Sequence, residues 1–72
     1  MELKAIKSSN IQAIGHDKKT STLTVQFKGG KTYNYADVPE KIYNQFKSAD
    51  SPGNFFHVNI KGVFQSTIAG MK

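Results

Sequence analysis

The residues best suited to binding chemistry are two tyrosines one position apart, Tyr33 and Tyr35, and the imidazole of His16. Aromatic rings and imidazoles stack on unpaired nucleobases, and each stack contributes about 1–3 kcal/mol. Alternate residues of a strand share one face, so the two tyrosines of a Tyr-Asn-Tyr strand point the same way. The spacing predicts an aromatic platform for single-stranded RNA or DNA, provided that this face is accessible.

Lysines supply the charge that such a platform needs. The ten basic residues are all lysine and outnumber five acids, giving a formal net charge of +5. A lysine ammonium neutralises a phosphate as a point charge, whereas base edges are often read by the planar fork of arginine. We therefore expect backbone contact to outweigh sequence readout. The candidate phosphate-binding lysines are Lys18, Lys19, Lys28 and Lys31.

These lysines do not by themselves define one patch. Lys18 and Lys19 precede the most regular predicted strand, and Lys28 and Lys31 follow it. The alternative is that lysines spread along a small chain only keep it soluble.

A second hypothesis is a protein-interaction module, a small regulator or inhibitor of a larger host protein. It would use either the polar face of the sheet or the region of Phe55 and Phe56. Phe55 is the candidate anchor, because Phe56 and Ile60 packed inward on a short helix would leave Phe55 near the surface. Core packing competes for the same side chain, since a chain of this size needs most of its apolar residues for its core.

We expect no enzymatic activity, cofactor or metal. His16 and His57 have the chemistry of a base and an acid in a nuclease, with Lys61 stabilising a phosphorane, but nothing in the sequence places both histidines near one substrate. Two histidines, scattered carboxylates and no cysteine form no recognisable zinc pattern.

Length and composition limit the architecture. A chain of 72 residues is one domain, and at this size it buries only about 60% of the surface that its unfolded form exposes. The start MELKAIKSSN lacks the apolar run of a secretory signal, no stretch approaches transmembrane length, and the absence of cysteine fits a reducing compartment. We expect a cytoplasmic domain without membrane contact, with a core over about residues 7–64 and frayed ends.

Three strands must position these side chains, over residues 11–16, 22–27 and 31–36. The second is the most regular, because its apolar and polar residues alternate strictly. Gly15 weakens the first strand and marks either a bulge or a close backbone approach.

The Gly29–Gly30 turn leaves two registers open. A two-residue loop would place Tyr33 and Tyr35 on the same side of the sheet as the polar residues of the preceding strand. A three-residue loop, made of a type I turn and a left-handed glycine, would instead place Val25 opposite Tyr33 and Leu23 opposite Tyr35. Burial normally sets register, so we favour the second arrangement, with tyrosine rings packed and their hydroxyls at the sheet edge.

The segment after the third strand predicts a helix over residues 38–49. Asp37 is expected to cap it, with Pro39 in the first turn and Glu40 three residues after the cap. The side chains expected to face the sheet are Ile42, Tyr43, Phe46 and Ala49.

The last third of the chain is less regular. Ser51-Pro52-Gly53 is expected to end the helix, and residues 54–61 fit either a short helix or an irregular segment, of which we prefer the helix. Residues 63–68 suit an edge strand, and residues 69–72 are expected to be frayed. The predicted fold is α+β, a three- to four-stranded antiparallel sheet with one main helix and a short second helix on one face.

The motifs SSNIQAIGHD, LTVQF, GG, YNY, DVP, IYNQF, SADSPGNFF and NIKG follow one another in this order. From about Lys7 to Phe64 the chain resembles the KTSC family, named for the C-terminus of some lysyl-tRNA synthetases. Its hallmark Tyr-x-Tyr is matched by Tyr33 and Tyr35. The other matching positions are Ser9, Ile11, Gly15, Asp17, Gly30, Val38, Pro39, Ser51, Gly53 and Ile60.

The resemblance implies a fold more firmly than a function. Members include small stand-alone bacterial and phage proteins, and attachment to a tRNA-charging enzyme suggests RNA binding by association. The chain departs from the family at His16, where tyrosine is commoner, and in using lysine where arginine often appears. We expect a non-enzymatic KTSC-type module that binds single-stranded RNA or DNA, with a protein-binding regulator as the alternative.

Overall fold

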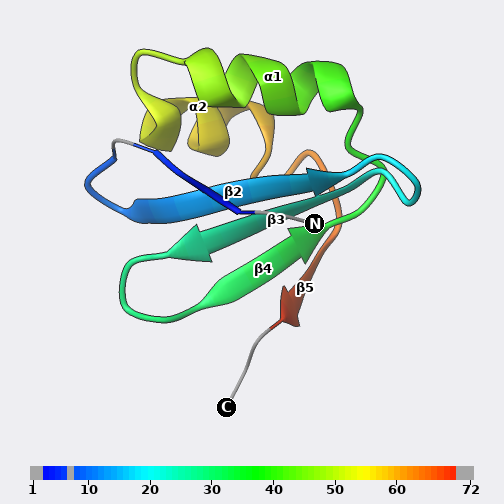
Figure 1. Ribbon diagram of the computed structural model, residues 1–72, viewed down its shortest axis with the longest axis horizontal. Coiled ribbons are helices and arrows are strands. Elements are labelled where there is room, and N and C mark those ends of the chain that lie inside the picture. Colours follow the sequence, from blue (N-terminus) through cyan, green and yellow to red (C-terminus); the bar gives the residue numbers. More distant parts are fainter. Residues whose placement is uncertain (1–2, 7, 70–72) are drawn as a thin grey trace.

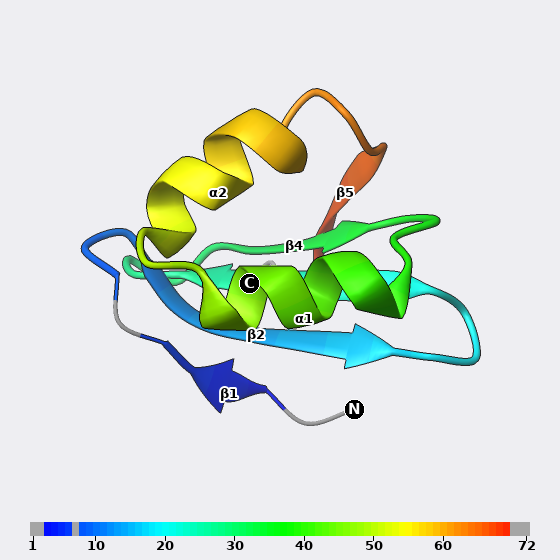
Figure 2. The ribbon, with the colours of Figure 1, turned by 90° about the horizontal axis from the view of Figure 1, so that it is seen from above.

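The computed structural model describes residues 3–6 and 8–69. They form a five-stranded antiparallel sheet in the order β1-β2-β3-β4-β5, with two helices on one face (Figure 1). Seen from the helix side, α1 runs along β2, and the connection after α2 leads to β5 (Figure 2). The elements are β1 (Lys4–Ala5), β2 (Ile11–Asp17), β3 (Thr22–Phe27), β4 (Thr32–Tyr35), α1 (Glu40–Ser48), α2 (Pro52–Asn59) and β5 (Ser66–Ala69).

The α+β class and the pair of helices are confirmed, and the sheet has more strands than predicted. β1 was not predicted; its two residues, in a segment expected to be frayed, pair with β2. The edge strand expected over residues 63–68 is β5, which begins later and includes Ala69. Residues 1–2, 7 and 70–72, some of which were also expected to be frayed, lie outside the described residues.

The core lies between the sheet and the helices. Leu23 and Val25 are fully buried on the helix-facing side of β3, and Phe46 of α1 is fully buried with them. Phe56 and Ile60 point inward as predicted, with 8% and 0% of their surface exposed. Both helices of the described residues lie on this one face of the sheet (Figure 1).

The favoured register of the tyrosine strand is confirmed. Val25 pairs with Tyr33 and Leu23 pairs with Tyr35, so both tyrosines lie on the helix-facing side of the sheet. The turn itself differs from the prediction. Gly29 and Gly30 both have φ 103°, and a positive φ at Gly29 is typical of a type II turn rather than type I.

The predicted cap at Asp37 is wrong. Asp37 makes no side-chain cap, lies at φ 59°, and α1 begins at Glu40 with Pro39 as N-cap. The reason is tertiary: Val38 is fully buried and its N–H donates to the carbonyl of Ser21 at 2.8 Å. The chain changes direction at Asp37 to bury Val38, so the helix starts at Glu40 and not at residue 38.

Two further local predictions need correction. Ser51-Pro52-Gly53 was expected to end the first helix, but it begins the second. α1 ends at Ser48, and Pro52 is the first residue of α2, where a missing N–H costs little. The bulge in β2 lies between Ile11 and Ala13, not at Gly15, which pairs with Thr24. Neither described helix has the length and apolar character needed to cross a membrane.

Candidate functional site

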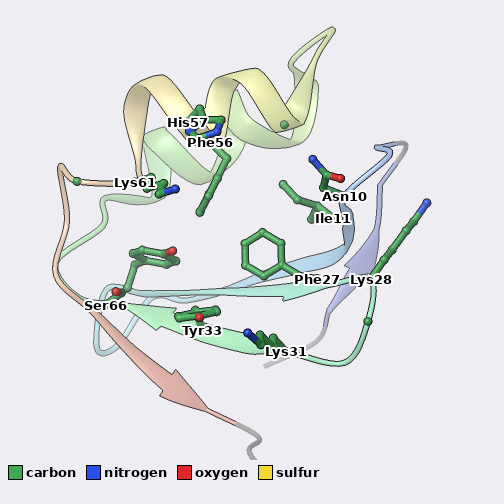
Figure 3. A pocket seen from close by; sticks show the side chains of 14 residues that line it. Asn10, Ile11, Phe27, Lys28, Lys31, Tyr33, Phe56, His57, Lys61 and Ser66 are labelled. Atoms are coloured by element: carbon green, nitrogen blue, oxygen red, sulfur yellow. The ribbon is translucent and has the colours of Figure 1, made fainter.

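A cleft of about 650 Å³ opens between the sheet and α2. The β3–β4 hairpin forms one wall, and α2 with the loop after it forms the other. Figure 3 shows Phe56 pointing from α2 toward the sheet, with Phe27 and Tyr33 facing it from β3 and β4. The size is within the range of small-molecule and cofactor sites in proteins.

Four aromatic side chains line the cleft. The rings of Phe27 and Tyr33 meet edge-on at 5.7 Å, and Phe56 makes similar contacts with Phe27 at 5.3 Å and Tyr35 at 5.7 Å. Tyr33 and Tyr35 lie 6.5 Å apart with their planes 29° from parallel. Tyr35 and Phe56 are buried, whereas Phe27 and Tyr33 are half-buried. A ligand in the cleft can therefore reach Tyr33 and Phe27.

The rim of the cleft is basic. Lys28 and Lys31 come from the β3–β4 turn, His57 from α2 and Lys61 from the loop that follows, and all four are exposed. Figure 3 shows Lys31 beside Tyr33 on the sheet side and Lys61 on the helix side. None of the described residues that line the cleft is acidic. An anion entering the cleft would meet positive charge on both walls.

The buried Tyr35 does not offset this charge. Burial raises the pKa of the Tyr35 phenol above its ordinary value of 10.0, and the neighbouring Tyr33 raises it further. Tyr35 therefore stays neutral at physiological pH. Its ring contributes apolar surface and its hydroxyl contributes hydrogen-bonding capacity, without adding negative charge to the cleft.

The structure divides the residues predicted from the sequence into two groups. Tyr33 and Tyr35 lie in the cleft with Lys28 and Lys31. The others are at the opposite end of β3, a strand of six residues and so about 20 Å long. This second group consists of His16, Lys18 and Lys19.

His16 has a structural role at its end of the sheet. Its Nε2 lies 2.6 Å from the carbonyl oxygen of Val38, and because that oxygen can only accept, Nε2 carries the proton. Its ring stacks on Tyr43 of α1 at 5.5 Å. Both contacts tie β2 to α1 and the segment before it, whereas the buried Nδ1 has no hydrogen-bond partner among the described residues.

The two neighbouring lysines also lie outside the cleft. Lys18 forms an exposed ion pair with Glu40 at 3.7 Å, and the N–H of Lys19 donates to Asp17 in the β2–β3 loop. An exposed pair of this kind contributes little to stability. The predicted basic patch is thus two separate groups of lysines, of which only Lys28 and Lys31 adjoin the tyrosines.

Phe55, the predicted protein anchor, is half-buried. Its ring stacks on the fully buried Phe46 at 5.4 Å with planes 16° from parallel. Packing against the core therefore covers much of the Phe55 side chain, which leaves less of it to anchor a partner. The exposed large apolar side chains of the described residues lie elsewhere, at Leu3, Val58, Val63 and Ile68.

The residues considered for catalysis are not brought together. His16 is on β2 against α1, whereas His57 is on α2 and lines the cleft with Lys61. No group of three or more histidine and acidic side chains among the described residues is arranged to hold a metal ion.

Sequence reasoning did not place Phe27, His57 or Lys61 beside the tyrosines, and it considered His57 and Lys61 only as partners of His16 in catalysis. A usable signal was present. Phe56 and Ile60 are four residues apart and point inward, so His57, the residue after Phe56, falls beside that face of the helix. Lys61 lies in the loop after α2 and has no such signal.

Two short helices on one face of an antiparallel sheet, with an aromatic cleft beside the second helix, define the class: a small α+β domain. A family model of the KTSC domain matches residues 7–64. The chain belongs to the KTSC domain family, as its ordered motifs predicted over the same residues.

Relatives and a solved structure agree with this assignment. A protein of Tsukamurella paurometabola is 33% identical over 64 residues, which are 89% of this chain and 96% of that protein. A lysine–tRNA ligase of Nostoc sp. is 37% identical over 59 residues, 82% of this chain but 10% of the ligase. The crystal structure of a KTSC domain protein from Yersinia pestis is similar with a TM-score of 0.90, at 40% identity, covering 96% of this chain and 97% of that one.

Proposed function

We propose that this chain is a non-enzymatic binding module that takes single-stranded RNA or DNA into the cleft between the sheet and α2. The observation that carries the proposal is the half-buried ring of Tyr33 in a cleft with Lys31 on one wall and Lys61 on the other, where none of the described lining residues is acidic.

The expected contacts follow from the chemistry of an unpaired nucleotide. Its base would stack on Tyr33, and its phosphates would be neutralised by lysines of the two walls. The bases of a duplex are already paired and stacked, so the cleft favours single strands. Because the chain contains no arginine, we expect weak preference among sequences.

The relatives support RNA as one ligand. The matched segment of the Nostoc protein is part of a lysine–tRNA ligase, a protein whose name states that it acts on tRNA. The matched segment is a tenth of that ligase, and this support is by association with the larger protein.

A titration of the isotope-labelled domain with a short mixed-sequence single-stranded RNA tests the proposal. NMR shifts are expected at Tyr33, Lys31 and Lys61 and are expected to weaken between about 50 mM and 200 mM salt. The variant Tyr33→Leu keeps an apolar side chain and removes the ring, so binding should weaken by roughly fivefold to 150-fold, the range expected for one stack. A spectrum unchanged by RNA at both salt concentrations would exclude the nucleic-acid site.

A further inference from the structure

The outer side of β5 is an open strand edge. β5 is the last strand of the sheet and pairs with β4 on its inner side. Among the described residues no strand pairs with its outer side, and Figure 1 shows this strand at the margin of the sheet. This edge is a different surface from the aromatic floor of the cleft, although Ser66, Lys31 and Lys61 line the cleft as well. Pairing of a strand with the edge does not require nucleic-acid binding.

The direction of the free backbone groups can be worked out from one hydrogen bond. The N–H of Ala36 donates to the carbonyl of Gln65 at 2.9 Å, so the polar backbone groups of Gln65 face β4. Backbone groups alternate in direction along a strand, so those of Thr67 also face β4. The N–H and C=O of Ser66 and of Ile68 therefore point outward from the sheet.

The residues of β5 are not of the types that usually block an edge. Its sequence, Ser-Thr-Ile-Ala, contains neither a charge nor a proline, and Ser66, Thr67 and Ile68 are exposed. Natural sheets protect their edges with short strands, lysine, proline or bulges. The opposite edge has such protection, because β1 has two residues and one is Lys4.

The surroundings of β5 would favour particular side chains in a paired strand. Ile68 is 56% exposed and lies opposite Tyr33, and Ser66 lies opposite Tyr35 and lines the cleft. The inward-facing side chains of an added strand would come to lie beside Ile68 and Ser66 at the mouth of the cleft. Apolar residues at alternate positions would cover Ile68.

The local charge favours an acidic partner. Lys31 precedes Thr32, which pairs with Ala69 at one end of β5, and Lys61 lines the cleft with Ser66. One acidic residue is nearby, Asp37, which follows the hydrogen-bonded Ala36 at the opposite end of the strand. The whole chain carries a net charge of +5, so a second copy would be repelled where an acidic peptide is attracted.

We propose that the outer edge of β5 binds an extended acidic peptide by strand addition. The four residues of β5 span about 13 Å and so pair with about four residues of the peptide. The outward N–H and C=O groups of Ser66 and Ile68 supply the hydrogen bonds, alternate apolar side chains cover Ile68, and flanking carboxylates lie near Lys31 and Lys61. Strand addition of this type draws its affinity from the main chain.

Amide hydrogen exchange measured by NMR tests the proposal directly. The probe is a capped peptide, Asp-Val-Thr-Val-Thr-Val-Thr-Asp, at millimolar concentration. We expect the amides of Ser66 and Ile68, exposed in the free protein, to exchange at least tenfold more slowly with the peptide, while that of Thr67, bonded to β4, changes much less. The same peptide with lysine in place of both aspartates should protect them less.

A pair of variants separates backbone pairing from side-chain contact. Ile68→Pro removes an outward N–H that β4 does not use, whereas Ile68→Ala keeps that N–H and removes most of the side chain. Ile68→Pro should weaken peptide binding about fivefold more than Ile68→Ala does, the effect of one backbone hydrogen bond. Retained shifts for α1 in both variants show that they fold.

The remaining outcomes overturn the proposal. Absence of protection at Ser66 and Ile68 with every peptide means that the edge does not accept a strand. Protection that grows with protein concentration in the absence of peptide means that a second copy of the chain occupies the edge. Equal binding by Ile68→Pro and Ile68→Ala means that any peptide contact does not use the backbone of β5.

Discussion

Lysines of the cleft should control the salt dependence of nucleic-acid binding. Lys28, Lys31 and Lys61 line the cleft, and each phosphate neutralised on a single strand contributes about −0.7 to the slope of log affinity against log salt concentration. Three contacts give a slope of about −2.1. Raising salt from about 50 mM to 200 mM should therefore weaken binding about 18-fold.

The double variant Lys31→Ala/Lys61→Ala removes one lysine from each wall. One contact then remains, and the same change in salt should weaken binding only about 2.6-fold. The matched control is Lys18→Ala/Lys19→Ala, which removes the same charge at the opposite end of β3. It should retain the steep slope, apart from a small effect of losing the exposed Lys18–Glu40 pair.

Fluorescence anisotropy with a labelled single-stranded RNA of mixed sequence measures both slopes. Thermal unfolding of the two double variants establishes that they fold equally well. Equal slopes in the two variants would refute the reasoning, because binding would then depend on total charge and not on the cleft. A slope that flattens only in the control would move the site to the β2–β3 end of the sheet.

Three further predictions concern stability and are measured by urea unfolding. Asp37 lies at φ 59°, where glycine is favoured, so Asp37→Gly should be more stable than Asp37→Ala by about 1 kcal/mol; the reverse order would contradict the assigned backbone. His16→Ala loses the hydrogen bond to Val38 and the stack on Tyr43, together about 1–3 kcal/mol, and an unchanged midpoint would show that neither contact matters. The raised pKa of Tyr35 means that the folded state holds the phenol proton more tightly than the unfolded state, so this contribution to stability is complete below pH 10.0 and is lost as pH rises through the folded pKa. The free energy of unfolding of Tyr35→Phe should therefore fall less steeply above pH 10.0 than that of the parent protein. Parallel pH dependences of the two proteins would argue against the shift.

The parts of the fold that were predicted correctly are those fixed by burial. Leu23 and Val25 must face the helices, and only one loop length brings Tyr33 and Tyr35 to the same face. The inward positions of Phe56 and Ile60 follow in the same way from helical spacing. The register of the strands and the side of each helix that faces the core can therefore be predicted from the sequence.

The parts that were missed depend on contacts between distant segments. Asp37 has the residue type of a cap, but the bond from Val38 to Ser21 decides where the chain turns. β1 has two exposed residues and hence no pattern to detect. The aromatic half of the site was predicted from Tyr-Asn-Tyr, whereas Lys61 enters it only because α2 lies over the hairpin.

The open cleft lowers the stability that a chain of this size can gain from burying its apolar side chains. A small domain has little apolar surface to bury, yet Phe27 and Tyr33 remain half-buried at the cleft. Across the cleft, Phe56 of α2 meets Phe27 of β3 and Tyr35 of β4 edge-on. Larger side chains on the facing wall would close the gap and add burial. In their place stand glycines at 53 and 62, the lysine Lys61 and the imidazole of His57. An aromatic surface left open behind a basic rim stabilises the fold less than a filled core would, and this is the expected arrangement where the open surface has a ligand.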